Sequence, residues 1–177
     1  QLSGAMPADL SRLSALQNLY LGNNKLTEGI PRELGNLASI QRIYLNDNPL
    51  GATIPAELGN LRTLVSLVVY STQLTGTIPG GLGNLASLQE IDLSGNQLSG
   101  TIPPDLGRLG ALQRLSIAGN QLTGAIPPEL AQLGALQRLE LNGNQLSGSI
   151  PAELGGLKEL VTLSLYSNRL TGAIPAQ

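Results

Sequence analysis

The chain has 177 residues, a formal net charge of −2 and 12% charged residues. It therefore fits one domain or one unbroken array, and it lacks the strong field that would recruit nucleic acid or an anionic membrane. Cysteine and histidine are absent, which excludes disulfides, thiolate catalysis and the commonest zinc ligand. No apolar run is long enough to span a membrane. We expect no nucleic-acid partner, no membrane insertion and no cofactor.

Prolines recur at one constant interval along the whole chain. They stand at Pro7, Pro31, Pro55, Pro79, Pro103, Pro127, Pro151 and Pro175. A fixed period of roughly 20 to 50 residues is typical of stacked structural repeats. We expect a single array over residues 1–177. It comprises a partial coil (1–6), seven coils of equal length (7–174), each starting at its own proline, and the start of a further coil (175–177).

Each coil has a segment in which apolar and polar residues alternate. Examples are LQNLYL at 16–21, IQRIYL at 40–45 and LQEIDL at 88–93. Alternation of this kind predicts a strand with one buried face. Because every coil returns to the same place, successive strands must pair in parallel about 4.8 Å apart, which gives a sheet roughly 30 Å wide.

The half-coil after each proline, such as PPDLGRLGA at 103–111, is short and rich in glycine. It predicts a 3₁₀ turn or a short helix. Acidic residues near its start suit the positive end of a helix dipole, so we assign them no catalytic role. They are Asp9, Glu33, Glu57, Asp105, Glu129 and Glu153. With strands on one side and tight turns on the other, the sheet should form the concave face.

One asparagine position recurs in almost every coil and predicts an inward-facing ladder. Its members are Asn24, Asn48, Asn96, Asn120, Asn144 and Asn168. A buried amide persists when backbone groups of adjacent loops use its donors and its acceptor. Thr72 interrupts the series, and its hydroxyl can replace only part of that hydrogen bonding.

Neither end of the array carries a recognisable cap. Terminal repeats need a polar cap to cover the last core layer, whereas this chain begins in mid-coil and stops at IPAQ. We expect a segment of a longer solenoid, or a protein whose ends associate with another copy.

The full pattern is L-x-x-L-x-L-x-x-N-x-L-x-G-x-I-P-x-x-L-G-x-L, with LSGTIP at 98–103 and LTGAIP at 122–127 as specific examples. It resembles the plant-specific subtype of leucine-rich repeat over essentially the whole chain. Similar arrays occur in ectodomains of plant receptor kinases, receptor-like proteins, polygalacturonase inhibitors and algal Roco-type proteins. The resemblance implies a right-handed α/β solenoid that recognises a protein or peptide on its concave face, with a second short sheet near the LxGxIP segment.

The resemblance places such proteins outside the cell. The chain has no cysteine, no N-x-S/T sequon and no signal peptide, so an intracellular location stays equally open. An algal, bacterial or consensus-engineered origin stays open as well.

Side chains that flank the inward apolar positions of each strand should point out to the concave side. The first row is Asn18, Arg42, Ser66, Glu90, Arg114, Arg138 and Thr162. The second row is Tyr20, Tyr44, Val68, Asp92, Ser116, Glu140 and Ser164. The third row is Gly22, Asn46, Tyr70, Ser94, Ala118, Asn142 and Tyr166. All four tyrosines of the chain fall in these rows.

We expect Tyr20, Tyr44, Val68 and Tyr70 to form one patch in the N-terminal half of this face. Tyrosine combines apolar area with a polar tip and is enriched at binding hot spots, which favours partner binding. The alternative is that the rings only stabilise strand pairing by stacking along the sheet.

The C-terminal half is charged. Arg114 and Arg138 should lie side by side, and the acids beside them are Glu90 and Glu140. This arrangement favours a self-satisfied ion-pair network over an anion clamp. The predicted partner-binding set is Tyr20, Arg42, Tyr44, Val68, Tyr70, Glu90, Asp92, Arg114, Arg138, Glu140 and Tyr166.

Catalysis would have to rely on carboxylates alone. Glu90 and Asp92 should lie about 6.5 Å apart on one face, within reach of glycosidase geometry. An open sheet offers no enclosed pocket to separate their pKa values, and Arg114 nearby would keep both ionised. We therefore predict that the chain is not an enzyme.

Two alternatives to partner recognition remain. One is a structural or consensus-engineered scaffold without a ligand. The other is an ice-binding surface built on hydroxyl rows, although a structural role for these hydroxyls in the turn or second sheet is favoured. The rows contain Ser3, Thr27, Thr75, Ser99, Thr123, Ser147 and Thr171, with Thr53, Thr77, Thr101 and Ser149 beside them.

Overall fold

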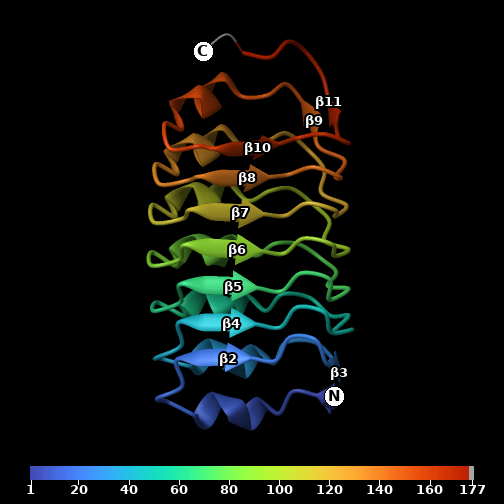
Figure 1. The fold of residues 1–177 in the computed structure, drawn as a ribbon, viewed down its shortest axis with the longest axis vertical. Coiled ribbons are helices and arrows are strands. Elements are labelled where there is room, and N and C mark those ends of the chain that lie inside the picture. The colour runs from blue at the N-terminus through green and yellow to red at the C-terminus, as the bar shows by residue number, and fades with distance from the viewer. Residues whose placement is uncertain (176–177) are drawn as a thin grey trace.

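The computed structural model describes residues 1–175, which form one continuous stack of coils with the first and last described residues toward opposite ends (Figure 1). Along this described part, seven parallel strands pair side by side in chain order. They are β2 (Asn18–Tyr20), β4 (Arg42–Tyr44), β5 (Ser66–Val68), β6 (Glu90–Asp92), β7 (Arg114–Ser116), β8 (Arg138–Glu140) and β10 (Thr162–Ser164). Each residue pairs with the equivalent residue of the next coil, as Leu19 does with Ile43. The predicted parallel sheet is confirmed.

Short 3₁₀ helices return the chain on the side away from the sheet. Within residues 1–175 they are η1 (Ala8–Arg12), η2 (Arg32–Asn36), η3 (Ala56–Asn60), η4 (Gly80–Asn84), η5 (Pro104–Arg108), η6 (Pro128–Gln132) and η7 (Ala152–Gly156). Each starts directly after the recurring proline, whose fixed φ suits a helix start. Each is short. At its end, the backbone N–H of the following leucine donates back into the turn, as Leu109 N does to Leu106 O. This confirms the prediction of short helical turns.

A second ladder of backbone hydrogen bonds runs beside the main sheet, near the LxGxIP segments. At the two ends of the stack this ladder forms short parallel strands. There β1 (Ser3–Ala5) pairs with β3 (Lys25–Thr27), and β9 (Ser147–Gly148) pairs with β11 (Arg169–Leu170). Between them, Ser99 N donates to Gly76 O and Thr123 N to Gly100 O, both over 2.7 Å. The second short sheet that the family resemblance implies is thus present, largely as single inter-coil bonds.

The core is a column of leucine and isoleucine side chains, and the predicted asparagine ladder lies beside it. Asn120 Nδ2 donates to Leu93 O over 3.1 Å and to Ile117 O over 3.0 Å. Its Oδ1 accepts from Leu98 N over 3.0 Å. Each amide therefore ties together backbone groups of neighbouring coils.

Thr72 replaces only part of this bonding, as predicted. Its hydroxyl lies 3.0 Å from Val69 O and 2.9 Å from Asn96 Oδ1. In the preceding coil, the N–H of Leu50 has no asparagine Oδ1 at position 72 to donate to. It donates to Asn48 O instead. The Thr72 side chain therefore makes one hydrogen bond to another coil, whereas the Asn120 side chain makes two.

Apolar side chains are exposed at both ends of the stack. Leu13 is 49% exposed in the first coil and Leu163 is 45% exposed in the last. Core leucines in the middle coils are fully buried, because each of those coils is covered on both sides. Of the further coil predicted over 175–177, residues 176 and 177 lie outside the described residues.

Candidate functional site

The outward side of strands β2 to β10, here called the sheet face, carries the candidate site. Strand register aligns the predicted rows residue by residue, with Arg42 opposite Ser66, Glu90 opposite Arg114, and Arg114 opposite Arg138. The constant repeat period therefore places side chains from successive coils along one surface, as the sequence predicts.

Two tyrosines form an aromatic pair at the N-terminal end of the sheet face. The ring centroids of Tyr20 and Tyr44 are 5.2 Å apart with an interplanar angle of 75°, an edge-to-face contact. In this geometry the positive edge of one ring meets the negative face of the other, which stabilises the pair. Tyr20 is 60% exposed, so the pair offers apolar area to a partner.

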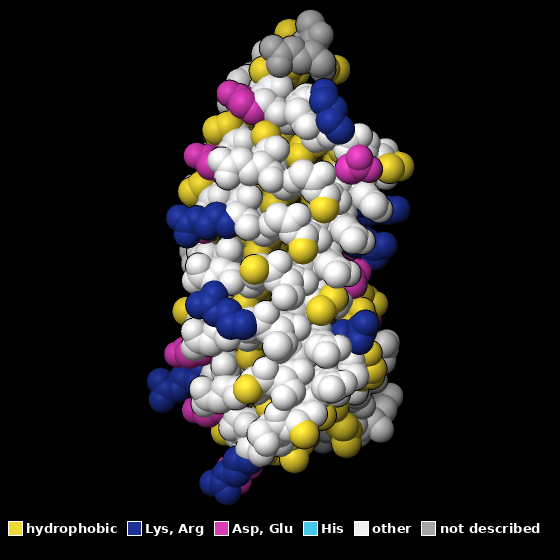
Figure 2. Space-filling model, turned by 90° about the vertical axis from the view of Figure 1, so that its left-hand side faces the viewer, with side chains coloured by type: hydrophobic (Ala, Val, Ile, Leu, Met, Phe, Trp, Pro, Cys, Tyr) yellow, Lys and Arg dark blue, Asp and Glu magenta, His cyan; other side chains and the backbone are white. Residues whose placement is uncertain are grey.

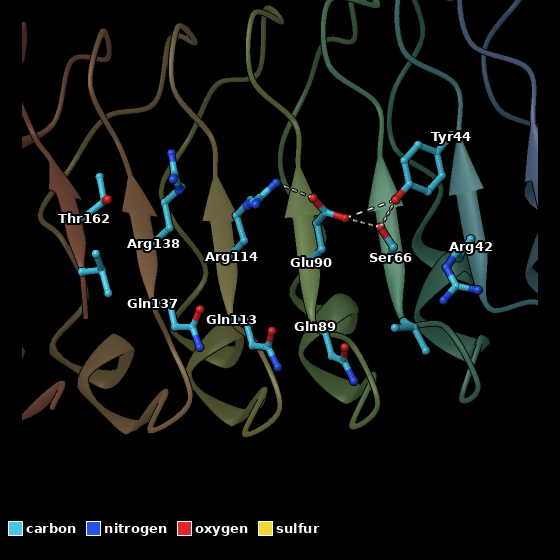
Figure 3. Close-up of a pocket in the computed structure, with 12 residues that line it drawn as sticks. Arg42, Tyr44, Ser66, Gln89, Glu90, Gln113, Arg114, Gln137, Arg138 and Thr162 are labelled. Carbon is cyan, nitrogen blue, oxygen red and sulfur yellow. Dashed lines mark hydrogen bonds and ion pairs between the residues drawn. The ribbon is translucent and has the colours of Figure 1, made fainter. Parts of the chain in front are cut away.

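Glu90 joins the aromatic half of the face to the basic half (Figure 3). Its Oε2 accepts from Ser66 Oγ over 2.6 Å and from the Tyr44 hydroxyl over 3.3 Å. Its Oε1 accepts from Arg114 Nη1 over 2.9 Å. The carboxylate thus fixes side chains from three other strands. Of these contacts, only the pairing with Arg114 is predicted from the sequence.

The remaining members of the predicted tyrosine patch are less accessible. Val68 is only 5% exposed, so it forms the floor beneath its neighbours and adds little contact area. The Tyr70 hydroxyl accepts from Asn46 Nδ2 over 2.9 Å. Burial, followed by the charge and hydrogen bond of Asp47, raises the pKa of Tyr70 above its ordinary value. Asp92 Oδ1 accepts from the hydroxyl of Ser94 over 2.6 Å.

The basic half of the face is largely neutralised by nearby carboxylates. Besides the Arg114–Glu90 contact, Arg138 Nη1 lies 3.3 Å from Glu140 Oε1. Both contacts match the ion-pair network that the sequence favours, and their exposure limits their energetic value. Arg42 instead donates to Asn18 Oδ1 over 3.2 Å. Tyr166 lies near the opposite end of the stack and is 68% exposed.

A shallow groove of about 390 Å³ runs along the stack, across the strands. Its floor and walls include the first-row residues from Arg42 to Thr162. A row of glutamines also lines it, Gln89, Gln113 and Gln137 (Figure 3). This glutamine row is not among the site residues predicted from the sequence. A signal existed, because the position before each first-row residue is glutamine in every coil except two, which carry valine at 65 and 161.

The distribution of charged side chains on the surface is mixed, in keeping with the small net charge of the chain. On the side shown in Figure 2, basic and acidic side chains are interspersed, and no extended patch of one sign forms there. Among residues 1–175, no group of three or more acidic side chains is placed to hold a metal ion. No helix in the same range has the length and hydrophobicity of a membrane span.

The hydroxyl rows lie by the second backbone ladder. Ser99 Oγ donates to Gly76 O over 3.3 Å, and Thr123 Oγ1 donates to Gly100 O over 3.2 Å. These contacts give the hydroxyls a role in joining coils, which is the structural alternative to ice binding.

Two protein-family models match the sequence of this chain. A family model described as leucine-rich repeat region matches residues 2–123, and a second, described as leucine rich repeat, matches residues 111–170. A search of curated protein sequences gives no match.

Solved structures include close matches from plants and from a bacterium. The ectodomain of the Arabidopsis thaliana receptor kinase GASSHO1/SCHENGEN3, in complex with CASPARIAN STRIP INTEGRITY FACTOR 2, is 43% identical with a TM-score of 0.98; the match covers 99% of this chain and 21% of that one. The plant peptide hormone receptor RGFR1, in complex with RGF2, is 38% identical with a TM-score of 0.97, covering 98% and 28%. The Leptospira interrogans LRR protein LIC12759 is 34% identical with a TM-score of 0.83, covering 95% and 41%. This chain therefore spans less than half the length of each.

Proposed function

We propose that this chain, which belongs to the leucine-rich-repeat proteins, binds an extended peptide or protein segment across its sheet face. The fold and family are those of non-enzymatic ligand-binding modules. The tyrosines at one end anchor the partner, and the charged residues of the other half orient it. The module forms part of a larger receptor or scaffold protein.

The Tyr20–Tyr44 pair at the end of the groove, in which Tyr20 is exposed and Tyr44 is half-buried, is the observation that carries this proposal. Aromatic side chains next to a polar groove are the usual composition of a binding hot spot and its rim. Glu90 holds Tyr44 in place through Ser66 and its own carboxylate, so little side-chain entropy is lost when a partner binds. Plant receptors of the same fold, solved in complex with peptides such as RGF2, support a peptide as the partner.

A selection from a random-peptide display library on the immobilised chain tests the proposal. Enriched peptides are then titrated by calorimetry against the wild type and against the double variant Tyr44→Ala, Tyr70→Ala. Each hot-spot aromatic is worth about 2 kcal/mol or more, so affinity should fall at least about thirtyfold. Thermal unfolding of the same samples checks that the variant keeps its fold.

The matched control is Arg62→Ala with Arg108→Ala, on the side of the stack that carries the 3₁₀ helices. Its affinity should equal that of the wild type. A selection that yields no peptide sensitive to the tyrosine substitutions contradicts the proposal and favours a scaffold without a ligand.

A further inference from the structure

The first two full coils are joined without the second backbone ladder that joins the other coils. The coils are numbered here from coil 1 (7–30) to coil 7 (151–174). From coil 2 onward, at least two backbone hydrogen bonds in the region of this ladder join each coil to the next. Between coils 3 and 4, for example, Gln97 N donates to Leu74 O over 2.8 Å and Ser99 N to Gly76 O over 2.7 Å. Within residues 1–175, no backbone hydrogen bond joins residues 25–29 of coil 1 to residues 49–53 of coil 2.

The sequence of coil 2 explains this gap. Coil 4 reads QLSGT at 97–101, whereas coil 2 reads PLGAT at 49–53. Proline has no N–H, so Pro49 cannot donate as Gln97 does. The N–H of Gly51 donates to Thr72 O on coil 3 over 3.1 Å, away from coil 1.

The facing segment of coil 1 has the regular conformation. Glu28 adopts a φ of 65°, close to the 74° of Gly76 at the equivalent position of coil 3. A residue other than glycine is uncommon in this left-handed region, so coil 1 keeps the backbone path of the ladder in spite of its side chain. The two donors are therefore missing from coil 2, and the acceptor side is in place.

The interface between coils 1 and 2 is consequently the weakest between full coils in backbone hydrogen bonds. Besides the main sheet it keeps the Asn48 amide, which accepts from Leu26 N over 3.0 Å and donates to Leu21 O over 2.9 Å. The next interface lacks the asparagine bonds because Thr72 replaces the amide. It keeps its backbone bonds, however, and Thr63 Oγ1 adds one to Ile40 O over 2.8 Å.

The aromatic pair of the candidate site spans this weak interface. Tyr20 lies on coil 1 and Tyr44 on coil 2, with ring centroids 5.2 Å apart. In a stack of repeats, stability is a sum of terms for each repeat and each interface, so the stack parts most easily at its weakest interface. We propose that coil 1 opens away from coil 2 as a unit, which separates Tyr20 from Tyr44. The aromatic part of the sheet face is then complete only in the closed form.

Native-state hydrogen exchange of the full chain, followed by nuclear magnetic resonance, tests this opening. The reporter is the Leu21 amide, which donates to Tyr44 O over 2.8 Å and is released when coil 1 leaves coil 2. The triple variant Pro49→Gln, Gly51→Ser, Ala52→Gly gives coil 2 the QLSGT sequence of coil 4 and supplies both missing donors. Two net hydrogen bonds change an equilibrium constant by at least about fivefold, so exchange at Leu21 should slow by that factor or more.

The opposite end of the stack offers a matched pair of variants. Arg169 N donates to Leu146 O over 2.8 Å at the position of coil 7 that corresponds to Pro49. Arg169→Pro removes this donor and should speed exchange of the Leu141 amide, which donates to Ser164 O across the same interface. Arg169→Ala keeps the backbone N–H and should leave exchange at Leu141 unchanged, as should the triple variant of coil 2.

An unchanged exchange rate at Leu21 in a folded triple variant would overturn the proposal. Equal exchange at Leu141 in Arg169→Pro and Arg169→Ala would also overturn it, because the ladder donors then would not control opening. If circular dichroism shows that the triple variant does not fold, the Arg169 pair decides alone. None of these measurements uses a ligand, so a failed peptide selection bears on the proposed function and leaves the opening of coil 1 standing.

Discussion

Asn96 should be among the most sensitive positions in the chain. Its Oδ1 accepts from Thr72 N over 3.1 Å and from Leu74 N over 3.0 Å. Both donors belong to fully buried residues. Replacing Asn96 by alanine removes this acceptor from both donors.

The loss can be worked out from the groups left unpaired. Val69 O keeps a contact with the Thr72 hydroxyl and Leu93 O keeps the Asn120 amide, so the carbonyl groups stay paired. The two N–H groups, of Thr72 and Leu74, lose their acceptor. A buried donor left without a partner costs about 1–3 kcal/mol, so Asn96→Ala should lower the free energy of unfolding by about 2–6 kcal/mol.

Chemical denaturation followed by circular dichroism measures this change. Asn96→Thr should lose less, because threonine occupies the equivalent position at Thr72 and its hydroxyl oxygen can accept one hydrogen bond. Asn60→Ala is the matched control, because Asn60 is exposed at the end of η3, and its effect should stay within about 0.5 kcal/mol. A loss below about 1 kcal/mol for Asn96→Ala, the lowest cost of one unpaired buried donor, would refute the view that this ladder holds the coils together.

Two further perturbations probe the packing of the coils and the electrostatics of the sheet face. A Cβ at Gly83 would overlap the backbone carbonyl of Asp105 on the next coil, whereas one at Gly110 meets nothing within 4 Å. In denaturant unfolding, Gly83→Ala should therefore lose about 1–3 kcal/mol and Gly110→Ala almost nothing; equal stabilities would contradict this packing. The raised pKa of Tyr70 means that its stabilising contribution is complete below the ordinary tyrosine pKa and is lost as the pH rises through its folded pKa. Ultraviolet titration should show one tyrosine ionising later than the others, and a late component that persists in Tyr70→Phe would assign it to another residue.

The sequence by itself determines the architecture and the orientation of the variable residues. Each coil touches the coil one repeat before it and the coil one repeat after it, so a period in the sequence becomes a contact in space. For this reason the asparagine position of Asn96 could be predicted as a ladder, and Tyr20 and Tyr44 could be predicted as neighbours on one face. The same logic predicted the pairing of Glu90 with Arg114 across one strand spacing.

Only the tertiary structure decides which conformations the long side chains on that face adopt. Whether Val68 is exposed depends on the conformations of the side chains beside it, and the sequence repeat does not specify their torsion angles. The contact of Glu90 with Ser66 and Tyr44, and that of Tyr70 with Asn46, arise from such choices. The glutamine row reaches the groove from residues just before the strands, where strict alternation of sides no longer applies. A repeat fixes the positions of Cβ atoms, and the polar contacts made several bonds further out require the packed structure.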